Sequence, residues 1–314
     1  MSPTRRNAAL GLAAAAATLP ATPALGQIAQ AAVEAPEADE PRTELNTTQS
    51  KNEHMLAPVQ INGQGPFQFV IDTGANASCV SHSLMKRLDL KTHDTAPVHT
   101  VVGVTHRPVV MLDELRVGPR NRKRVRAPAL PIKGADVDGV LGVDWLKGQR
   151  LVMDFKNRKL EITRSQSDVN EAGRVVVVPA RRRHGQLTIV DADLSGRRIS
   201  AIIDSGAQAT LCNSRLRDLV RAQEAKKGRR EVPVLVRMES LAGEPFVGES
   251  VFLPFLRLGG LHLGNVPVTC ADMHVFKIWD LEDTPALVLG MDLLGQFEQV
   301  ALDFGRSQVR FDFT

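Results

Sequence analysis

The amino-acid sequence predicts an all-β protein, mostly strands with a few short helices, built as two homologous barrel-like lobes related by a pseudo-twofold axis. Two observations carry this prediction. Short apolar runs recur between Gly, Pro and Asn residues, which is typical of strands separated by turns. A set of sequence blocks also occurs twice in the same order, which indicates an internal duplication. At 314 residues, the chain is long enough for two modest domains that each have a core.

The first duplicated block is an apolar run that ends in Asp, a small hydroxyl residue, Gly and Ala. It reads FVIDTGA at 69–75 and AIIDSGA at 201–207. The later blocks follow in matching order: LRVG (115–118) and LRLG (256–259), GVLGVDWL (139–146) and LVLGMDLL (287–294), and LVMDF (151–155) and VALDF (300–304). A lone carboxylate is costly to bury after a strand. Its occurrence twice with the same flanks predicts that the carboxylates of Asp72 and Asp204 meet.

Strands are expected wherever Val, Ile, Leu and Phe cluster between turns. The expected strands are 67–71, 109–115, 151–155, 175–178, 187–190, 199–203, 232–237 and 309–313. Helices are expected at 81–88 and 214–225. The second of these has Leu216, Leu219 and Val220 at a spacing that places them on one helical face.

A further short helix is expected after each Gly-x-Asp block, near Trp145 and near Leu293. Asp144 and Asp292 stand where such a helix would begin. A carboxylate at that position accepts hydrogen bonds from backbone N–H groups, so N-capping is the expected role of both residues.

The chain divides into five expected segments. A charged start with Arg5 and Arg6, an apolar run at 8–19 and small residues near 24–26 are typical of a cleavable export signal. This pattern predicts a periplasmic or otherwise exported protein. The segments are a signal peptide (1–26), a flexible linker or pro-segment (27–53), an N-terminal lobe (54–163), an inter-lobe linker (164–183) and a C-terminal lobe (184–314).

Composition excludes several functions. The formal net charge is only +4, aromatic residues make up 4% of the chain and Tyr is absent, so nucleic-acid binding is not expected. The scattered His residues form no His-Glu-x-x-His motif, and neither a metal nor another cofactor is expected. Basic runs at 120–126 and 181–183 are interpreted as solvated loops. The alternative is that they attract anionic lipid headgroups or an acidic substrate.

The three cysteines are Cys79, Cys212 and Cys270. An odd number leaves at least one free thiol. Cys79 and Cys212 each follow an Asp motif, so they are expected on similar buried strands in different lobes. The preferred interpretation is that all are buried free thiols, and a Cys212–Cys270 disulfide within one lobe stays open as the alternative.

These blocks resemble those of the retropepsin-like aspartic proteases. The resemblance rests on Asp-Thr-Gly-Ala and Asp-Ser-Gly-Ala, each with its downstream apolar-apolar-Gly block, and it covers roughly 54–163 and 184–314. It implies that each lobe supplies one Asp to a cleft that a β-hairpin flap covers. The exported, duplicated form is similar to bacterial periplasmic aspartyl proteases of the PerP type. That similarity implies a monomer with an internal pseudo-dimer, and a substrate that is an extended polypeptide, including membrane-anchored envelope proteins.

The resemblance assigns catalysis to Asp72 and Asp204, which share a proton and activate a water for attack on a peptide bond. No covalent intermediate is needed. Thr73 and Ser205 would support the dyad through hydroxyl hydrogen bonds across the pseudo-twofold axis. Gly74 and Gly206 would let the backbone approach the carboxylates closely.

The substrate cleft has its own candidates. Ala75 and Ala207 would flank it, by analogy with the family. Gly103 and Gly243 lie in the expected flap hairpins, at 101–105 and 240–244. The absence of Tyr means that the flap chemistry of the pepsins does not transfer to this chain.

Two other interpretations remain open from the sequence. The chain could be a catalytically inactive scaffold that binds extended peptides in the same cleft, although a binder needs no paired Asp. Alternatively, the lobes could pair between chains and not within one, which a measurement of molecular size would separate.

Overall fold

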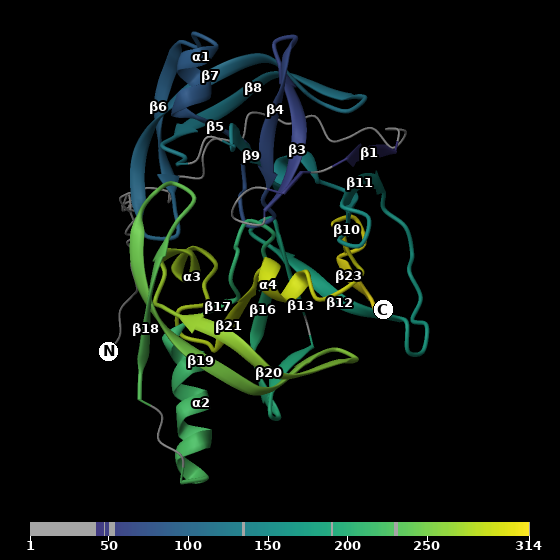
Figure 1. Ribbon diagram of the computed structural model, residues 1–314, viewed down its shortest axis with the longest axis vertical. Coiled ribbons are helices and arrows are strands. Elements are labelled where there is room, and N and C mark those ends of the chain that lie inside the picture. The colour runs from purple at the N-terminus through teal and green to yellow at the C-terminus, as the bar shows by residue number, and fades with distance from the viewer. Residues whose placement is uncertain are drawn as a thin grey trace, which may run out of the picture.

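A computed structural model of the chain describes residues 42–46, 48–49, 54–133, 136–189, 191–228 and 232–313. It has two lobes, with the N-terminal lobe (purple to blue) above the C-terminal lobe (green to yellow) in Figure 1. The all-β prediction is confirmed, since strands make up most of both lobes. The signal peptide expected at 1–26 lies outside the described residues.

The N-terminal lobe is a β-sheet that closes on itself. Its strands are β2 (Thr48–Gln49), β3 (Met55–Ile61), β4 (Gln64–Ile71), β5 (Cys79–Ser81), β6 (Thr92–His99), β7 (Val104–Val117), β8 (Arg120–Leu130) and β9 (Gly139–Leu141). They pair in the order β2-β3-β4-β9-β5-β8-β7-β6, and an additional pairing of β3 with β7 closes the barrel. Phe69, Leu112 and Leu115 are fully buried inside it.

The C-terminal lobe repeats this topology. Its strands are β13 (Gln186–Ile189), β14 (Ala192–Leu194), β15 (Arg197–Arg198), β16 (Ser200–Ile203), β17 (Leu211–Cys212), β18 (Val234–Glu239), β19 (Pro245–Leu258), β20 (Leu261–Cys270) and β21 (Ala286–Leu289). The order β13-β16-β21-β17-β20-β19 takes the place of β3-β4-β9-β5-β8-β7, and β18 pairs with β19 as β6 does with β7. The duplicated sequence has therefore produced the same fold twice.

A shared sheet joins the lobes. Its strands are β1 (Thr43–Asn46), β10 (Gln149–Asp154), β11 (Lys159–Arg164), β12 (Val175–Arg183), β22 (Gln299–Asp303) and β23 (Gln308–Asp312), in the order β1-β11-β10-β22-β23-β12. The duplicated 151–155 and 300–304 blocks meet at its centre, where Leu151 pairs with Leu302. The range expected as a tether, 27–53, contains β1 and β2, and the expected linker, 164–183, contains β12. Polar composition concealed β1, where Glu44 is exposed between buried Thr43 and Leu45, whereas β12 extends the strand expected at 175–178 as far as Arg183.

Short helices lie where the sequence predicts them, with one addition. They are α1 (His82–Arg87), the 3₁₀ turn η1 (Val143–Trp145), α2 (Ser214–Lys226), α3 (His274–Ile278) and α4 (Met291–Leu294). Ser81 caps α1 and Asn213 caps α2, each accepting a backbone N–H with its side chain. The sequence analysis did not predict α3, because its five residues are too short for a helical period to show. None of the helices in the described part of the chain is long and apolar enough to cross a membrane.

The expected N-capping role of Asp144 and Asp292 is wrong. The residues that cap η1 and α4 are Gly142 and Gly290, and neither helix has a side-chain cap. Asp144 instead accepts the hydroxyl of Ser78 at 2.9 Å, and Asp292 accepts that of Thr210 at 2.7 Å. Ser78 Oγ also accepts the N–H of Gly142, and Thr210 Oγ1 accepts that of Gly290. The two carboxylates therefore fix the loop that follows each Asp motif.

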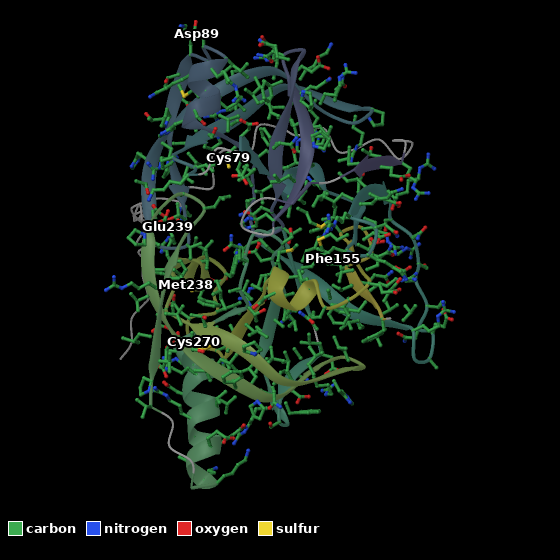
Figure 2. The ribbon with its side chains drawn as sticks, viewed as in Figure 1. Cys79, Asp89, Phe155, Met238, Glu239 and Cys270 are labelled. Carbon is green, nitrogen blue, oxygen red and sulfur yellow. A yellow bond between two sulfur atoms is a disulfide. The ribbon has the colours of Figure 1, made fainter. Side chains whose placement is uncertain are left out.

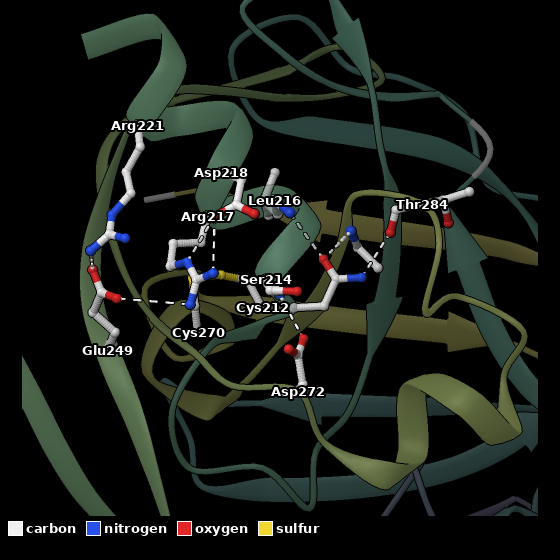
Figure 3. The surroundings of a disulfide bond; sticks show 12 residues. Cys212, Ser214, Leu216, Arg217, Asp218, Arg221, Glu249, Cys270, Asp272 and Thr284 are labelled. Carbon is white, nitrogen blue, oxygen red and sulfur yellow. Dashed lines mark hydrogen bonds and ion pairs between the residues drawn. A yellow bond between two sulfur atoms is a disulfide. The ribbon is translucent and has the colours of Figure 1, made fainter. Parts of the chain in front are cut away.

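Cys212 and Cys270 form a disulfide, and Cys79 is a buried free thiol. The preferred expectation of three free thiols is therefore wrong, and the alternative pairing is correct. β17 runs parallel to β20 in a register that sets Cys212 directly opposite Cys270. Figure 3 shows the bond beside the first turns of α2, where Arg217 and Arg221 both reach Glu249. A register between distant strands is not visible in sequence spacing.

Replacing both Cys212 and Cys270 by Ala is expected to lower the free energy of unfolding by about 2–4 kcal/mol. The disulfide closes a loop across a separation of 58 residues, and its removal gives the unfolded chain more conformational freedom. Urea unfolding of the double variant, compared with the oxidised and the reduced wild-type chain, measures this. An unfolding midpoint that reduction leaves unchanged would contradict it.

Candidate active site

Asp72 and Asp204 each begin the loop that follows a central strand of their lobe. Asp72 comes directly after β4, and its N–H donates to Leu141 O on the parallel strand β9 at 3.0 Å. Asp204 comes after β16 and donates in the same way to Leu289 O at 3.0 Å. The parallel pairing therefore places both carboxylates at the same kind of strand end, facing the other lobe.

The residues after the two Asp lock the lobes together. The N–H of Thr73 donates to Ser205 Oγ at 3.1 Å, and the N–H of Ser205 donates to Thr73 Oγ1 at 3.0 Å. In return, the hydroxyl of Thr73 donates to Ile203 O and that of Ser205 to Ile71 O. Both side chains are buried. The arrangement leaves no freedom for one loop to move without the other.

The glycines bring each loop against the opposite carboxylate. Gly74 N–H lies 2.8 Å from Asp72 Oδ1 and 3.2 Å from Asp204 Oδ1, and Gly206 N–H donates to Asp204 Oδ1 at 2.8 Å. A methyl group at Gly206 would lie 2.2 Å from Asp72 Cγ, and one at Gly74 would lie 2.4 Å from Asp204 Oδ2. No side chain larger than hydrogen fits at either position. The two carboxylates are thus neighbours at the lobe interface.

Burial shifts the titration of both carboxyl groups. Burial raises the pKa of Asp72 well above its usual value, and the charge of Asp204 and the hydrogen bond that Asp72 donates to Asp204 raise it further. Burial also raises the pKa of Asp204, while hydrogen bonds from Gly206 and Asp72 oppose that rise. Two carboxylates this close do not both ionise readily. The pair therefore tends to hold one proton between them, and it titrates as a unit.

Replacing Asp72 by Asn is expected to stabilise the fold at neutral pH by about 1–3 kcal/mol. A carboxyl group whose pKa is raised on folding contributes its full stability below its unfolded pKa and loses it as pH rises through the folded pKa. Asn has no proton to lose, so its advantage should be present at pH 7 and absent below about pH 4. Thermal unfolding at both pH values measures this. An equal difference at both would contradict the burial argument.

A cleft of about 2800 Å³ lies in front of the dyad, between the lobes. Ala75 and Ala207, which the sequence analysis placed beside the substrate, both line it. Gly103 and Gly243 lie in the turns of the β6–β7 and β18–β19 hairpins, which extend over this space. Each lobe therefore contributes a flap.

The two flaps reach across to the opposite lobes. The tip of the β6–β7 flap packs Val101 on the C-terminal lobe, where its carbonyl accepts the N–H of His274 in α3 at 2.8 Å. The tip of the β18–β19 flap packs Leu241 on an apolar cluster of the N-terminal lobe. Figure 2 shows Met238 and Glu239 on this second hairpin, on the side that approaches Cys79 of the N-terminal lobe.

The flaps also contact each other. Glu244 of the β18–β19 flap accepts the hydroxyl of Thr105 at 3.5 Å and lies 3.7 Å from Arg107, both on β7. His99 stacks on His274 beside this contact, with Nδ1 and Nε2 of the two rings 3.0 Å apart. The cleft is consequently covered from both sides in this structure.

The basic runs are strands and not the solvated loops that the sequence analysis expected. Residues 120–126 lie in β8 and 181–183 in β12. Arg122 lies over the ring of Trp145 and donates to Asp144 O at 2.6 Å. The methylene groups of its side chain can thus cover apolar surface while the guanidinium keeps a polar partner. Several of these cations line the cleft: Arg122, Lys123, Arg124, Arg126 and Arg182.

Sequence reasoning missed a second pair of residues at the dyad. His54 Nε2 lies 3.0 Å from Gly206 O, and Gln186 Nε2 lies 3.0 Å from Gly74 O. The signal that could have found them is position. His54 precedes Asp72 by the same interval as Gln186 precedes Asp204 (72 − 54 and 204 − 186).

A family model described as aspartyl protease matches residues 57–145 and again residues 190–293, once in each lobe. The chain belongs to the aspartyl protease family. Both matches of the aspartyl protease model contain an Asp motif and its downstream Gly-x-Asp block, which agrees with the duplicated topology. No curated protein matches the sequence. Among the described residues, no group of three or more His, Cys, Asp or Glu is placed to hold a metal ion.

Proposed function

We propose that this family member is an aspartic endopeptidase, in which Asp72 and Asp204 activate a water for direct hydrolysis of a peptide bond. The observation that supports this most strongly is the pair of adjacent, partly buried carboxyl groups that line a covered cleft. The ionised member of the pair takes a proton from the water, which attacks the peptide carbonyl. The protonated member donates to the developing oxyanion, and a proton then passes to the leaving nitrogen.

The substrate proposed is a polypeptide in extended conformation. Two hairpin flaps and the loops after β4 and β16 border the cleft, and an extended chain can pair with strand edges through its backbone. The cations on β8 favour acidic side chains in part of that peptide. Because the sheet that includes β10 and β22 unites the lobes within one chain, we propose that a monomer with an internal pseudo-dimer is the active form.

The proposed location is the cell envelope, after export and removal of residues 1–26. This location would expose membrane-anchored envelope proteins as substrates, in the manner of the PerP-type proteases that the sequence resembles. Detection of the mature chain in a periplasmic fraction, with an N-terminus near residue 27, tests the location separately from the activity.

The activity is tested by incubating the mature chain with a mixed peptide library from pH 4 to 7.5 and identifying the cut sites by mass spectrometry. In H₂¹⁸O, each new carboxyl group should carry one ¹⁸O, because hydrolysis takes one carboxyl oxygen from water. When a nucleophilic amine is added, cleavage should continue and no product with the amine coupled to the new carboxyl end should form. A covalent acyl intermediate would yield such a product. Peptides that bind but are not cut at any pH would instead favour the inactive scaffold.

A further inference from the structure

A buried polar side chain from each lobe holds the glycine of the opposite Asp motif. Gln186, which opens β13 in the C-terminal lobe, donates its amide N–H to Gly74 O of the N-terminal lobe. His54, directly before β3 in the N-terminal lobe, makes the matching contact with Gly206 O of the C-terminal lobe. Leu56 of β3 pairs with Val70, and Thr188 of β13 pairs with Ile202, which confirms that His54 and Gln186 occupy equivalent positions.

These contacts act on the peptide units that hold the carboxylates. Gly206 binds Asp204 through its N–H and His54 through its carbonyl oxygen. A carbonyl oxygen only accepts, so Nε2 of His54 carries the hydrogen. Only 4% of His54 and none of Gln186 is exposed to solvent, which shields both bonds from competition with water. Each side chain thus fixes the orientation of a loop on the far side of the lobe interface.

The two positions differ in one chemical property, since imidazole can take up a proton and the Gln amide cannot. The charges of two carboxylates act on the imidazole, Asp204 in the loop after β16 and Asp136 in the segment before β9. Burial lowers the pKa of His54, and both carboxylates oppose that effect. In the other direction, the charge of His54 lowers the pKa of Asp204. The donor at Nε2 is present in both protonation states, so the contact with Gly206 persists while the charge changes.

We propose that His54 is a positioning residue for the dyad, which anchors the Asp204 loop from the opposite lobe and, when protonated, helps to keep the dyad ionised in acid. This inference rests on the proposed endopeptidase function. His54 and Gln186 both lie outside the segments that the family model matches, 57–145 and 190–293. The duplicated site is therefore symmetric in shape and asymmetric in charge.

The experiment compares His54→Gln, His54→Ala and the matched control Gln186→Ala for kcat and KM of one cleaved peptide across pH. Both Ala variants should lose about tenfold to 100-fold in kcat with KM nearly unchanged, because a loop shift misplaces the reacting groups. His54→Gln keeps a donor and should recover most of kcat near neutral pH. Its acidic limb of kcat/KM should move to higher pH, while that of Gln186→Ala should stay in place.

Each contrary result has a distinct meaning. An unchanged kcat in His54→Ala would overturn the positioning role. If His54→Ala fails to fold, an acidic limb in His54→Gln that coincides with the wild-type limb would still overturn the charge role. A wild-type chain that cuts no peptide would overturn the proposed function. Titration of the ¹³C-labelled Asp carboxyl groups by NMR would then decide this inference, since His54→Gln should still raise the lower apparent pKa of the dyad.

Discussion

Replacing either Asp72 or Asp204 by Asn is expected to lower kcat/KM for peptide cleavage by about 10³- to 10⁴-fold. Asn has nearly the shape of Asp, so the backbone hydrogen bonds from Gly74 and Gly206 can persist. It can neither take a proton from water nor share one with its neighbour. Because the two carboxyl groups act as a unit, the double variant should lose little more activity than either single variant. Steady-state kinetics on one peptide measures all of them.

The matched control is Asp144→Asn. Asp144 is a partly buried carboxyl group that lines the same cleft, and its Oδ1 accepts the hydroxyl of Ser78. We expect this variant to keep kcat/KM within about tenfold of wild type, because it removes a loop contact and no reacting group. Full activity in Asp204→Asn, with a normal unfolding curve, would show that the water is activated elsewhere.

The dyad and the lobe topology could be predicted because the motifs that specify them occur twice in the sequence, in the same order. One Asp motif alone is a weak signal, whereas two copies with matching downstream blocks constrain where both Asp residues must lie. Thr73 and Ser205 followed from the same symmetry, since identical loops that meet at an axis must exchange identical bonds. A duplicated sequence therefore predicts an interface as well as a fold.

The features that could not be predicted depend on contacts between residues far apart in sequence. The strand register that joins Cys212 to Cys270 is one, and the contact of His274 with the opposite flap is another. Arg122 was hidden for a different reason. A strand rich in basic residues is easily mistaken for a solvated loop, because the sequence does not show that the ring of Trp145 packs against Arg122. His54 was missed because its partner position holds Gln186, and the two residue types look unrelated in sequence.

A second large effect, on stability, is expected from a substitution in the segment between the lobes. Asp168→Asn is expected to lower the free energy of unfolding by about 3–5 kcal/mol. The side chains of Arg150 and Asp168 are each only 3% exposed, and Nη1 of Arg150 lies 2.9 Å from Asp168 Oδ1. Nε of Arg150 has no hydrogen-bond partner within the described chain, so Asp168 is its main compensation. Without that charge, a guanidinium stays buried and unpaired.

The position of Asp168 makes this pair a link between the lobes. Arg150 belongs to β10 of the N-terminal lobe, and Arg310, on β23 of the C-terminal lobe, reaches the same carboxylate oxygen at 3.1 Å. Loss of the charge at Asp168 should therefore weaken the joint between the halves of the active site. We expect kcat to fall together with stability, because the dyad needs both lobes in register.

A double-mutant cycle in urea separates this effect from a general cost of substitution. Adding Arg150→Met to Asp168→Asn should restore much of the lost stability, since it removes the uncompensated cation and keeps an apolar side chain of similar length. The matched control is Asp89→Asn, at the far end of the N-terminal lobe in Figure 2, where an exposed ion pair with Lys91 should contribute less than about 1 kcal/mol. Equal losses in Asp89→Asn and Asp168→Asn, or no recovery in the double variant, would contradict a role for the buried charge. Burial decides the outcome, because the two pairs have similar lengths, 2.6 and 2.9 Å, and differ mainly in their access to water.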